Sequence, residues 1–155
     1  MQVGEAKALH TAKRSSGVDT SDPELAAAWA KVRADDTPDN WCAFTYKEGS
    51  STSLCLLGCG SSGMPELASA VNDGTVAFIG LRASVDARTR FFRVLFVGED
   101  VGGMKKGKAA LHKNAAFEVL EGAVGDLTCA SLAELTADAF REDMCKLGGG
   151  STVEC

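Results

Sequence analysis

The sequence predicts an α+β fold in three layers (α/β/α), in which a mixed, mostly antiparallel sheet of five strands lies between four helices. The first observation is the order of helix and strand patterns along the chain, α-β-β-α-β-β-α-β-α. The second is their spacing. Short polar turns join two pairs of strands and favour antiparallel pairing, whereas one strand-helix-strand passage permits a parallel pair. The helices are therefore expected to cover both faces of the sheet.

The first helix is expected from residue 23 to just before the turn at residues 35–38. Ser21 or Asp22 can cap its N-terminus, and Pro23 suits the first turn, where a missing N–H costs nothing. Apolar residues at helical spacing form the predicted buried face, namely Leu25, Ala28, Trp29 and Val32.

The first hairpin is predicted from two short runs rich in aromatic and apolar residues. Residues 41–46 form its first strand, residues 47–50 its loop and residues 52–57 its return strand. A short helix over residues 64–71 follows, after which Asn72-Asp73-Gly74 turns the chain.

The second pair of strands, residues 75–82 and 91–97, is joined through a polar turn around Asp86. A helix over residues 104–121 comes next, and residues 124–129 form a fifth strand. This strand-helix-strand passage is the one that permits parallel pairing.

The last helix is expected to open with a capping box, Ser131 to Glu134, and to run to about Lys146. Three consecutive glycines at 148–150 stop it. The chain of 155 residues can bury a core without disulfides or metals. We expect a flexible N-terminal extension (1–17), one domain (18–147) and a flexible C-terminal tail (148–155).

The predicted core consists of the apolar residues that fit these periods. They are Trp29, Val32, Phe44, Leu54, Leu56, Leu67, Val76, Phe78, Val94, Phe96, Leu111, Leu120, Leu127, Leu135 and Phe140.

Composition limits the classes of function. The chain has 16 basic and 21 acidic side chains and a net charge of −5, which argues against general nucleic-acid binding. No apolar run approaches the roughly 20 residues of a membrane span, and the first residues show no secretory signal. We therefore expect a cytoplasmic protein. The lack of a heptad pattern favours a monomer.

The six cysteines contain no Cys-x-x-Cys pair, and the two histidines, His10 and His112, stand far apart. This spacing favours reduced thiols over a metal site or a disulfide framework. The sequence gives little support for a set of catalytic residues, because too few histidines are present for a catalytic triad. We expect no metal, no cofactor and no enzymatic activity.

A glycine motif at residues 58–63 matches G-x-G-x-x-G, so a nucleotide-dependent enzyme is one alternative. The preceding strand, however, is the second arm of a hairpin, and the short helix after the motif contains Pro65. Both features disagree with a dinucleotide-binding β-α-β unit. A flexible strand-to-helix loop is the preferred interpretation.

Residues 86–113 form a basic segment in an acidic chain. They carry seven Arg or Lys and three acids, so their net charge is +4 and that of the remainder is −9. Such contrast suggests a surface for a negatively charged partner, although a solvated charged face is the alternative.

The passage GEDVGGMKKGKAALHKNAAFEVL (98–120) resembles the coactosin branch of the ADF/cofilin homology (ADF-H) family. The similarity includes LAAAWAKVRADDTPDNWCAFTYKEG, GLRASVDARTRFFRVLFVGED and ELTADAFREDMCKLGGG, and it covers roughly residues 18–150. It implies the ADF-H fold and a non-enzymatic cytoskeletal protein that binds the sides of actin filaments.

The resemblance also implies which residues contact F-actin. A basic residue at the turn into the fourth strand falls on Arg90, beside Arg88, and the helix over residues 104–121 faces actin. The implied contacts are Arg88, Arg90, Lys105, Lys106, Lys108, Lys113, Arg141 and Lys146, with Glu142 on the same final helix. We expect the arginines and the lysines to meet on one solvent-facing patch.

The alternative within this family is a cofilin-like protein that binds actin monomers and severs or depolymerises filaments. Its support is the SGV stretch at residues 16–18, which in ADF/cofilins lies at the extreme N-terminus. Against it, Gly107, Ala109 and Ala110 stand where cofilins have bulky apolar residues. The coactosin-like interpretation is preferred.

Overall fold

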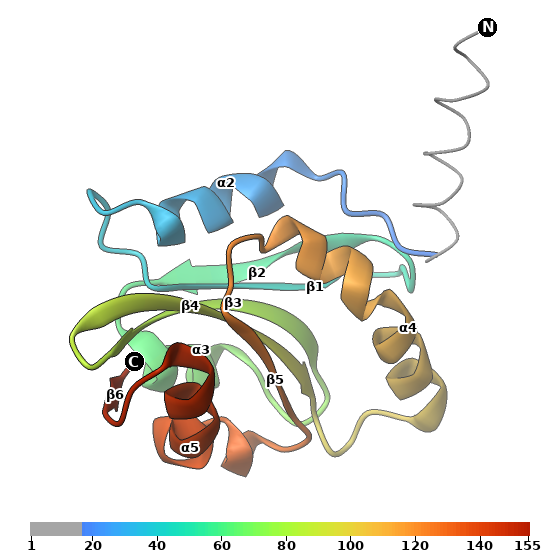
Figure 1. Ribbon diagram of the computed structural model, residues 1–155. Coiled ribbons are helices and arrows are strands. Elements are labelled where there is room, and N and C mark those ends of the chain that lie inside the picture. Colours follow the sequence, from blue (N-terminus) through green and yellow to red (C-terminus); the bar gives the residue numbers. More distant parts are fainter. Residues whose placement is uncertain (1–16) are drawn as a thin grey trace, which may run out of the picture.

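The computed structural model describes residues 17–155, so the expected N-terminal extension (1–17) lies outside the described residues apart from Gly17. A twisted sheet forms the middle layer, with α2 and α4 over one face and α3 and α5 over the other (Figure 1). The predicted three-layer α+β class is confirmed. No helix within residues 17–155 combines the length and the apolar character needed to cross a membrane.

The sheet has the strand order β2-β1-β3-β4-β5, and a short β6 pairs with β3 outside this path. Among the named strands of residues 17–155, β4 and β5 pair in parallel, which the strand-helix-strand passage permits, and the other pairs are antiparallel. The strands are β1 (Trp41–Tyr46), β2 (Leu54–Gly60), β3 (Val76–Val85), β4 (Arg88–Val97), β5 (Gly125–Cys129) and β6 (Val153–Glu154).

The α-helices within the described residues are α2 (Pro23–Arg33), α3 (Gly63–Ala70), α4 (Gly103–Val119) and α5 (Ala137–Gly148). The predicted cap of α2 is present, because Asp22 accepts a hydrogen bond of 2.9 Å from the Glu24 N–H and proline follows it. The Trp29 indole N–H donates to the Glu121 carbonyl at 2.9 Å and so ties α2 to the end of α4.

The β3–β4 hairpin is longer than expected. Its strands run to Val85 and from Arg88, so the turn consists of Asp86 and Ala87 alone. Both residues have left-handed backbone angles, with φ of 50° and 66°. A two-residue hairpin turn with two positive φ values matches the right-handed twist of the strands, and this allows pairing to continue to the tip.

The predicted start of the last helix is wrong. Ser131 makes no side-chain cap; Glu134 instead accepts a hydrogen bond of 2.9 Å from the Ala130 N–H, and a 3-10 turn spans Leu132–Glu134. Helix α5 begins after Thr136, whose hydroxyl accepts from the Ala139 N–H at 3.1 Å. The helical conformation is interrupted between the 3-10 turn and α5, where the buried Leu135 enters the core.

Residues 151–155, which belong to the expected flexible tail, make contacts with the sheet. They leave α5 through Gly149, which has a left-handed φ of 73°, and β6 then pairs with Ser84 and Val85 of β3. The β1–β3 pairing ends at Trp41 and Leu81, so the last part of β3 offers a free ladder edge that β6 occupies.

The core forms two clusters, one on each face of the sheet. All but two of the predicted core residues are buried. Leu56 on the edge strand β2 is only half-buried, and Leu111 on α4 is 63% exposed. Helix α4 turns Ala109, Ala116 and Phe117 inward, and this places His112, at 3% exposure, in the core instead of its neighbour Leu111.

Candidate functional site

The hairpin cluster consists of Arg88, Arg90 and Lys146. The two arginines begin β4, next to the turn, and their guanidinium groups reach the end of α5. Arg88 Nη2 donates to the Gly149 carbonyl at 2.8 Å, and Arg90 Nε donates to the Gly148 carbonyl at 3.3 Å. Lys146 is exposed in the last turn of α5, where a cation also suits the negative end of the helix.

Arg141 lies further back on α5 than the hairpin cluster, and it pairs with Asp138 on its own helix. Lys146 pairs with Glu142 at 3.7 Å. All four side chains are more than half exposed, so each ion pair contributes only about 0–1 kcal/mol to the free energy of folding. Each pair can therefore be exchanged for a contact with a binding partner. Arg141 is thus available for binding but is not anchored in the way that Arg88 is.

The helix cluster consists of Met104, Lys105, Lys106, Lys108, Leu111 and Lys113 on α4. Lys105 and Lys106 are exposed near the start of the helix, whose first turn has no acidic residue. Cations there oppose the helix dipole and cost about 0.3–1 kcal/mol each. Their position therefore does not serve helix stability, which makes them candidates for binding an acidic partner.

Two residues of the helix cluster were missed as site residues in the sequence. Met104 is 81% exposed and Leu111 is 63% exposed. They stand seven positions apart, so two helical turns bring them to the same side of α4. The spacing of Leu111 fits a helix face and so predicts burial. The signal against burial is that the adjacent His112 competes for the same inward position.

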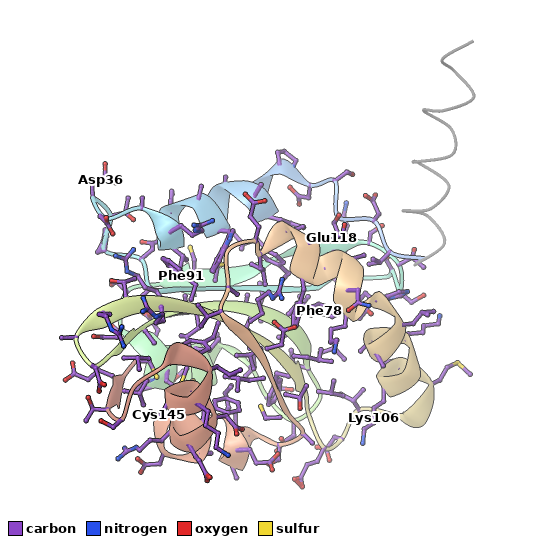
Figure 2. All side chains as sticks on the ribbon, viewed as in Figure 1. Asp36, Phe78, Phe91, Lys106, Glu118 and Cys145 are labelled. Atoms are coloured by element: carbon purple, nitrogen blue, oxygen red, sulfur yellow. The ribbon has the colours of Figure 1, made fainter. Side chains whose placement is uncertain are left out.

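The two clusters do not form one patch, and that prediction is wrong. Arg88 begins β4, whereas α4 starts only after the strand has ended at Val97. Nine residue steps of an extended strand span about 30 Å. The β3–β4 turn lies beside β6 at the left of Figure 1, and α4 begins at the far right, where Figure 2 labels Lys106. Apart from Lys146, the two clusters belong to the same segment of the sequence, but the extended strand β4 lies between them and holds them apart.

Arg93, the remaining arginine of the basic segment, has an internal role. Its Nε lies 2.7 Å from Asp126 Oδ1 of β5, and its guanidinium carbon lies 5.3 Å from the centre of the Phe117 ring. It thus joins the parallel β4–β5 pair to α4 and is not a candidate for partner binding.

A polar pair, the buried His112 and the half-buried Tyr46, lies beneath the helix cluster. The Tyr46 hydroxyl and His112 Nδ1 are 2.7 Å apart, and a Cβ at Gly17 would lie 3.3 Å from His112 Nε2. Burial, with a smaller contribution from the Lys108 charge, lowers the pKa of His112. Burial raises the pKa of Tyr46 to about 12. Helix α4 therefore rests on an imidazole that its surroundings keep neutral.

The glycine motif has a packing explanation. Gly58 and Gly60 belong to the antiparallel edge strand β2. Glu66 Oε1 accepts hydrogen bonds from Trp41 Nε1 at 2.8 Å and from the Ser62 N–H at 3.1 Å. A Cβ at Gly60 would overlap this carboxylate. The loop N–H that a phosphate would need is thus satisfied by the protein's own anion.

Comparison with known proteins agrees with this architecture. The profile of the family described as cofilin/tropomyosin-type actin-binding protein matches residues 17–145. The chain belongs to this family. Coactosin of Dictyostelium discoideum, a curated relative, is 34% identical over 108 residues, covering 66% of this chain and 73% of that protein.

A second relative is a mouse drebrin-like protein, which is 28% identical over 131 residues, or 83% of this chain. The chain spans 30% of that protein's length. Among solved structures, coactosin from Entamoeba histolytica has the same fold, with a TM-score of 0.75 at 21% identity over 87% of this chain and 99% of the other. The resemblance to coactosin-like ADF-H proteins is confirmed.

Proposed function

We propose that this protein is a non-enzymatic, cytoplasmic actin-binding protein that binds the sides of actin filaments and modulates their dynamics. Family membership and the similarity to coactosin support it. The observation that carries it is the pair of basic clusters at opposite ends of β4, on a chain with a net charge of −5. Their exposed cations are Arg88, Lys105, Lys106 and Lys146.

The separation of the clusters favours a filament over a single small epitope. Actin has an acidic surface, and a filament repeats that surface along its length. Two basic clusters that lie near opposite ends of a strand about 30 Å long can therefore engage separate acidic regions at the same time. Because exposed charge pairs are individually weak, affinity depends on several contacts together and falls as salt rises.

Co-sedimentation with actin filaments tests this proposal. The double reversal Arg88→Glu/Arg90→Glu should reduce the fraction that pellets by lowering affinity about 100-fold, because attraction becomes repulsion at two contacts. Lys31→Glu is the matched control, since it reverses an exposed cation on α2, a helix that carries no residue of either cluster. If the double reversal pellets as the parent does, the hairpin cluster is not the binding site.

The exposed Met104 and Leu111 support a second candidate, the cofilin-like binding of actin monomers. Large apolar side chains exposed next to lysines can be buried by a partner. Labelled filaments separate the two functions, because a severing protein accelerates filament loss and a side binder does not. Met104→Ala/Leu111→Ala should abolish any such acceleration while leaving the free energy of unfolding within about 0.5 kcal/mol.

A further inference from the structure

We propose that Asp86 is a positioning residue for actin binding: it clasps the C-terminal tail to the hairpin turn and thereby fixes Arg88 and Arg90 in the orientation that docks. This inference rests on the proposed function. Asp86 itself is an acid in a basic site, so its role is to act through the arginines.

The clasp is a dense set of hydrogen bonds between Asp86 and two tail residues. Asp86 Oδ1 accepts from the Thr152 N–H and the Thr152 hydroxyl, both at 2.8 Å. The Ser151 N–H lies 3.1 Å from each carboxylate oxygen. In return, the Asp86 N–H donates to the Thr152 carbonyl at 2.9 Å. The hydrogen bonds that the carboxylate accepts lower the pKa of Asp86, and the bond from the Thr152 hydroxyl has the largest effect. The carboxylate therefore stays charged at neutral pH.

The turn conformation alone does not require an aspartate. Asp86 has a φ of 50°, a region that glycine enters at no steric cost and asparagine tolerates well. The carboxylate therefore adds something other than turn geometry at this position. Its contacts identify that addition as attachment of residues 151–152.

The tail is shaped to reach Asp86. Gly149 turns the chain out of α5 with its left-handed φ of 73°. A Cβ at Gly150 would lie 2.6 Å from Asp86 Oδ2 and 2.6 Å from Val85 Cγ1, so only glycine permits this close approach. The glycine run that ends the helix is thus also the surface on which the hairpin turn packs.

The clasp and the arginine contacts belong to one continuous segment. Gly148 and Gly149, whose carbonyls accept from Arg90 and Arg88, precede the clasped residues with only Gly150 between. A guanidinium carries five N–H donors. Arg88 spends one of them on the Gly149 carbonyl, and this anchors the side chain while leaving others for a bidentate contact with a partner carboxylate. Releasing the tail would let the anchoring carbonyls move and would restore rotamer freedom to both arginines.

The test uses the full chain and two matched variants of the same turn. Asp86→Gly keeps a turn-compatible backbone and deletes the carboxylate. Ala87→Gly makes the same kind of change at the other turn residue, whose φ is 66°, and leaves the clasp intact. We expect Asp86→Gly to weaken filament pelleting about tenfold, which corresponds to about 1.4 kcal/mol, and Ala87→Gly to leave it unchanged.

Two further measurements distinguish positioning from a general structural role. Asp86→Asn keeps an oxygen acceptor and tolerates the positive φ, so it should recover part of the lost affinity. Nitrogen-15 relaxation of the Arg90 Nε–H should show greater mobility in Asp86→Gly than in Ala87→Gly. Thr152→Val, which removes one donor from the tail side, should shift affinity and mobility in the same direction as Asp86→Gly.

The outcomes separate this inference from the proposed function. If Asp86→Gly and Thr152→Val pellet as the parent while Arg88→Glu/Arg90→Glu does not, the arginines bind actin and the clasp proposal is overturned. It is equally overturned if Arg90 Nε mobility stays unchanged in Asp86→Gly. If Arg88→Glu/Arg90→Glu also pellets normally, the proposed site fails and the positioning role fails with it.

Discussion

The hairpin cluster and the helix cluster present positive charge in different ways. Arg88 and Arg90 are held by carbonyls at the end of α5, so their orientation is largely set before a partner arrives. Lys105 and Lys106 project from the start of α4, beside the exposed Met104. The difference indicates a division of labour. In the proposed binding to filaments, the anchored arginines would supply orientation at little entropic cost, and the lysines would supply long-range attraction that salt screens.

The largest effect is expected when both clusters are reversed together. Because the two reversed pairs lie near opposite ends of β4, a strand of about 30 Å, the free-energy losses of Arg88→Glu/Arg90→Glu and Lys105→Glu/Lys106→Glu should add in the quadruple variant. Pelleting across a range of actin concentrations measures each dissociation constant. A quadruple variant no weaker than the arginine pair alone would show that the two clusters do not engage the same filament together.

The next largest effect should come from exchanging the two cations. Arg88→Lys/Arg90→Lys keeps the charge but loses the bidentate geometry and the carbonyl anchors, so affinity should fall about tenfold. Lys105→Arg/Lys106→Arg is the matching exchange in the helix cluster and should change affinity less than twofold. Equal responses in the two clusters would contradict the distinction between orientation and attraction.

Reversing the helix cluster should weaken binding and stabilise the fold. Lys105→Glu/Lys106→Glu places acids near the positive end of α4, which should raise the free energy of unfolding by about 0.5–1 kcal/mol. Affinity for filaments should fall about fivefold at low salt and by less at high salt. Denaturant titration and pelleting over a salt series check both parts, and a loss of stability would contradict the dipole argument.

The smallest effect is expected from pH, through the buried His112 beneath the helix cluster. Its pKa is lowered in the folded state, so the unfolded chain binds the proton more readily. The stabilisation is therefore complete above the unfolded pKa of about 6.5 and is lost as pH falls through the lower folded value. Denaturant midpoints of the parent and His112→Gln between pH 5 and 7.5 test this. A variant with the same pH slope as the parent would exclude His112 as its source.

Local signals in the sequence predicted most of the fold. Pro23 after a capping aspartate placed the start of α2, and the apolar runs placed the five long strands and the two antiparallel hairpins, and permitted the parallel pair. The β1–β3 pairing and the early start of β4 at Arg88 were not predicted. These features depend on neighbours within a few residues, for which propensity and periodicity carry the information.

Features that depend on distant contacts were not predictable in the same way. The spacing of Leu111 and His112 on α4 fits burial of either residue, and the Tyr46 hydroxyl decides it by satisfying the imidazole. No strand was predicted in the tail, because β6 is only two residues long. It forms by pairing with the end of β3, a contact that is distant in the sequence. The single basic patch failed because the length of β4, which the turn at Asp86 extends to Arg88, separates the two clusters.

The ten paired positions of β3 and β4 have a mechanical consequence. If the two basic clusters grip neighbouring subunits of a filament, any tension between those subunits runs lengthwise along the covalent backbone of this hairpin. Hydrogen bonds between its arms then lie across the pull and need not break one after another. A small protein built this way then stays folded while it carries tension between two subunits.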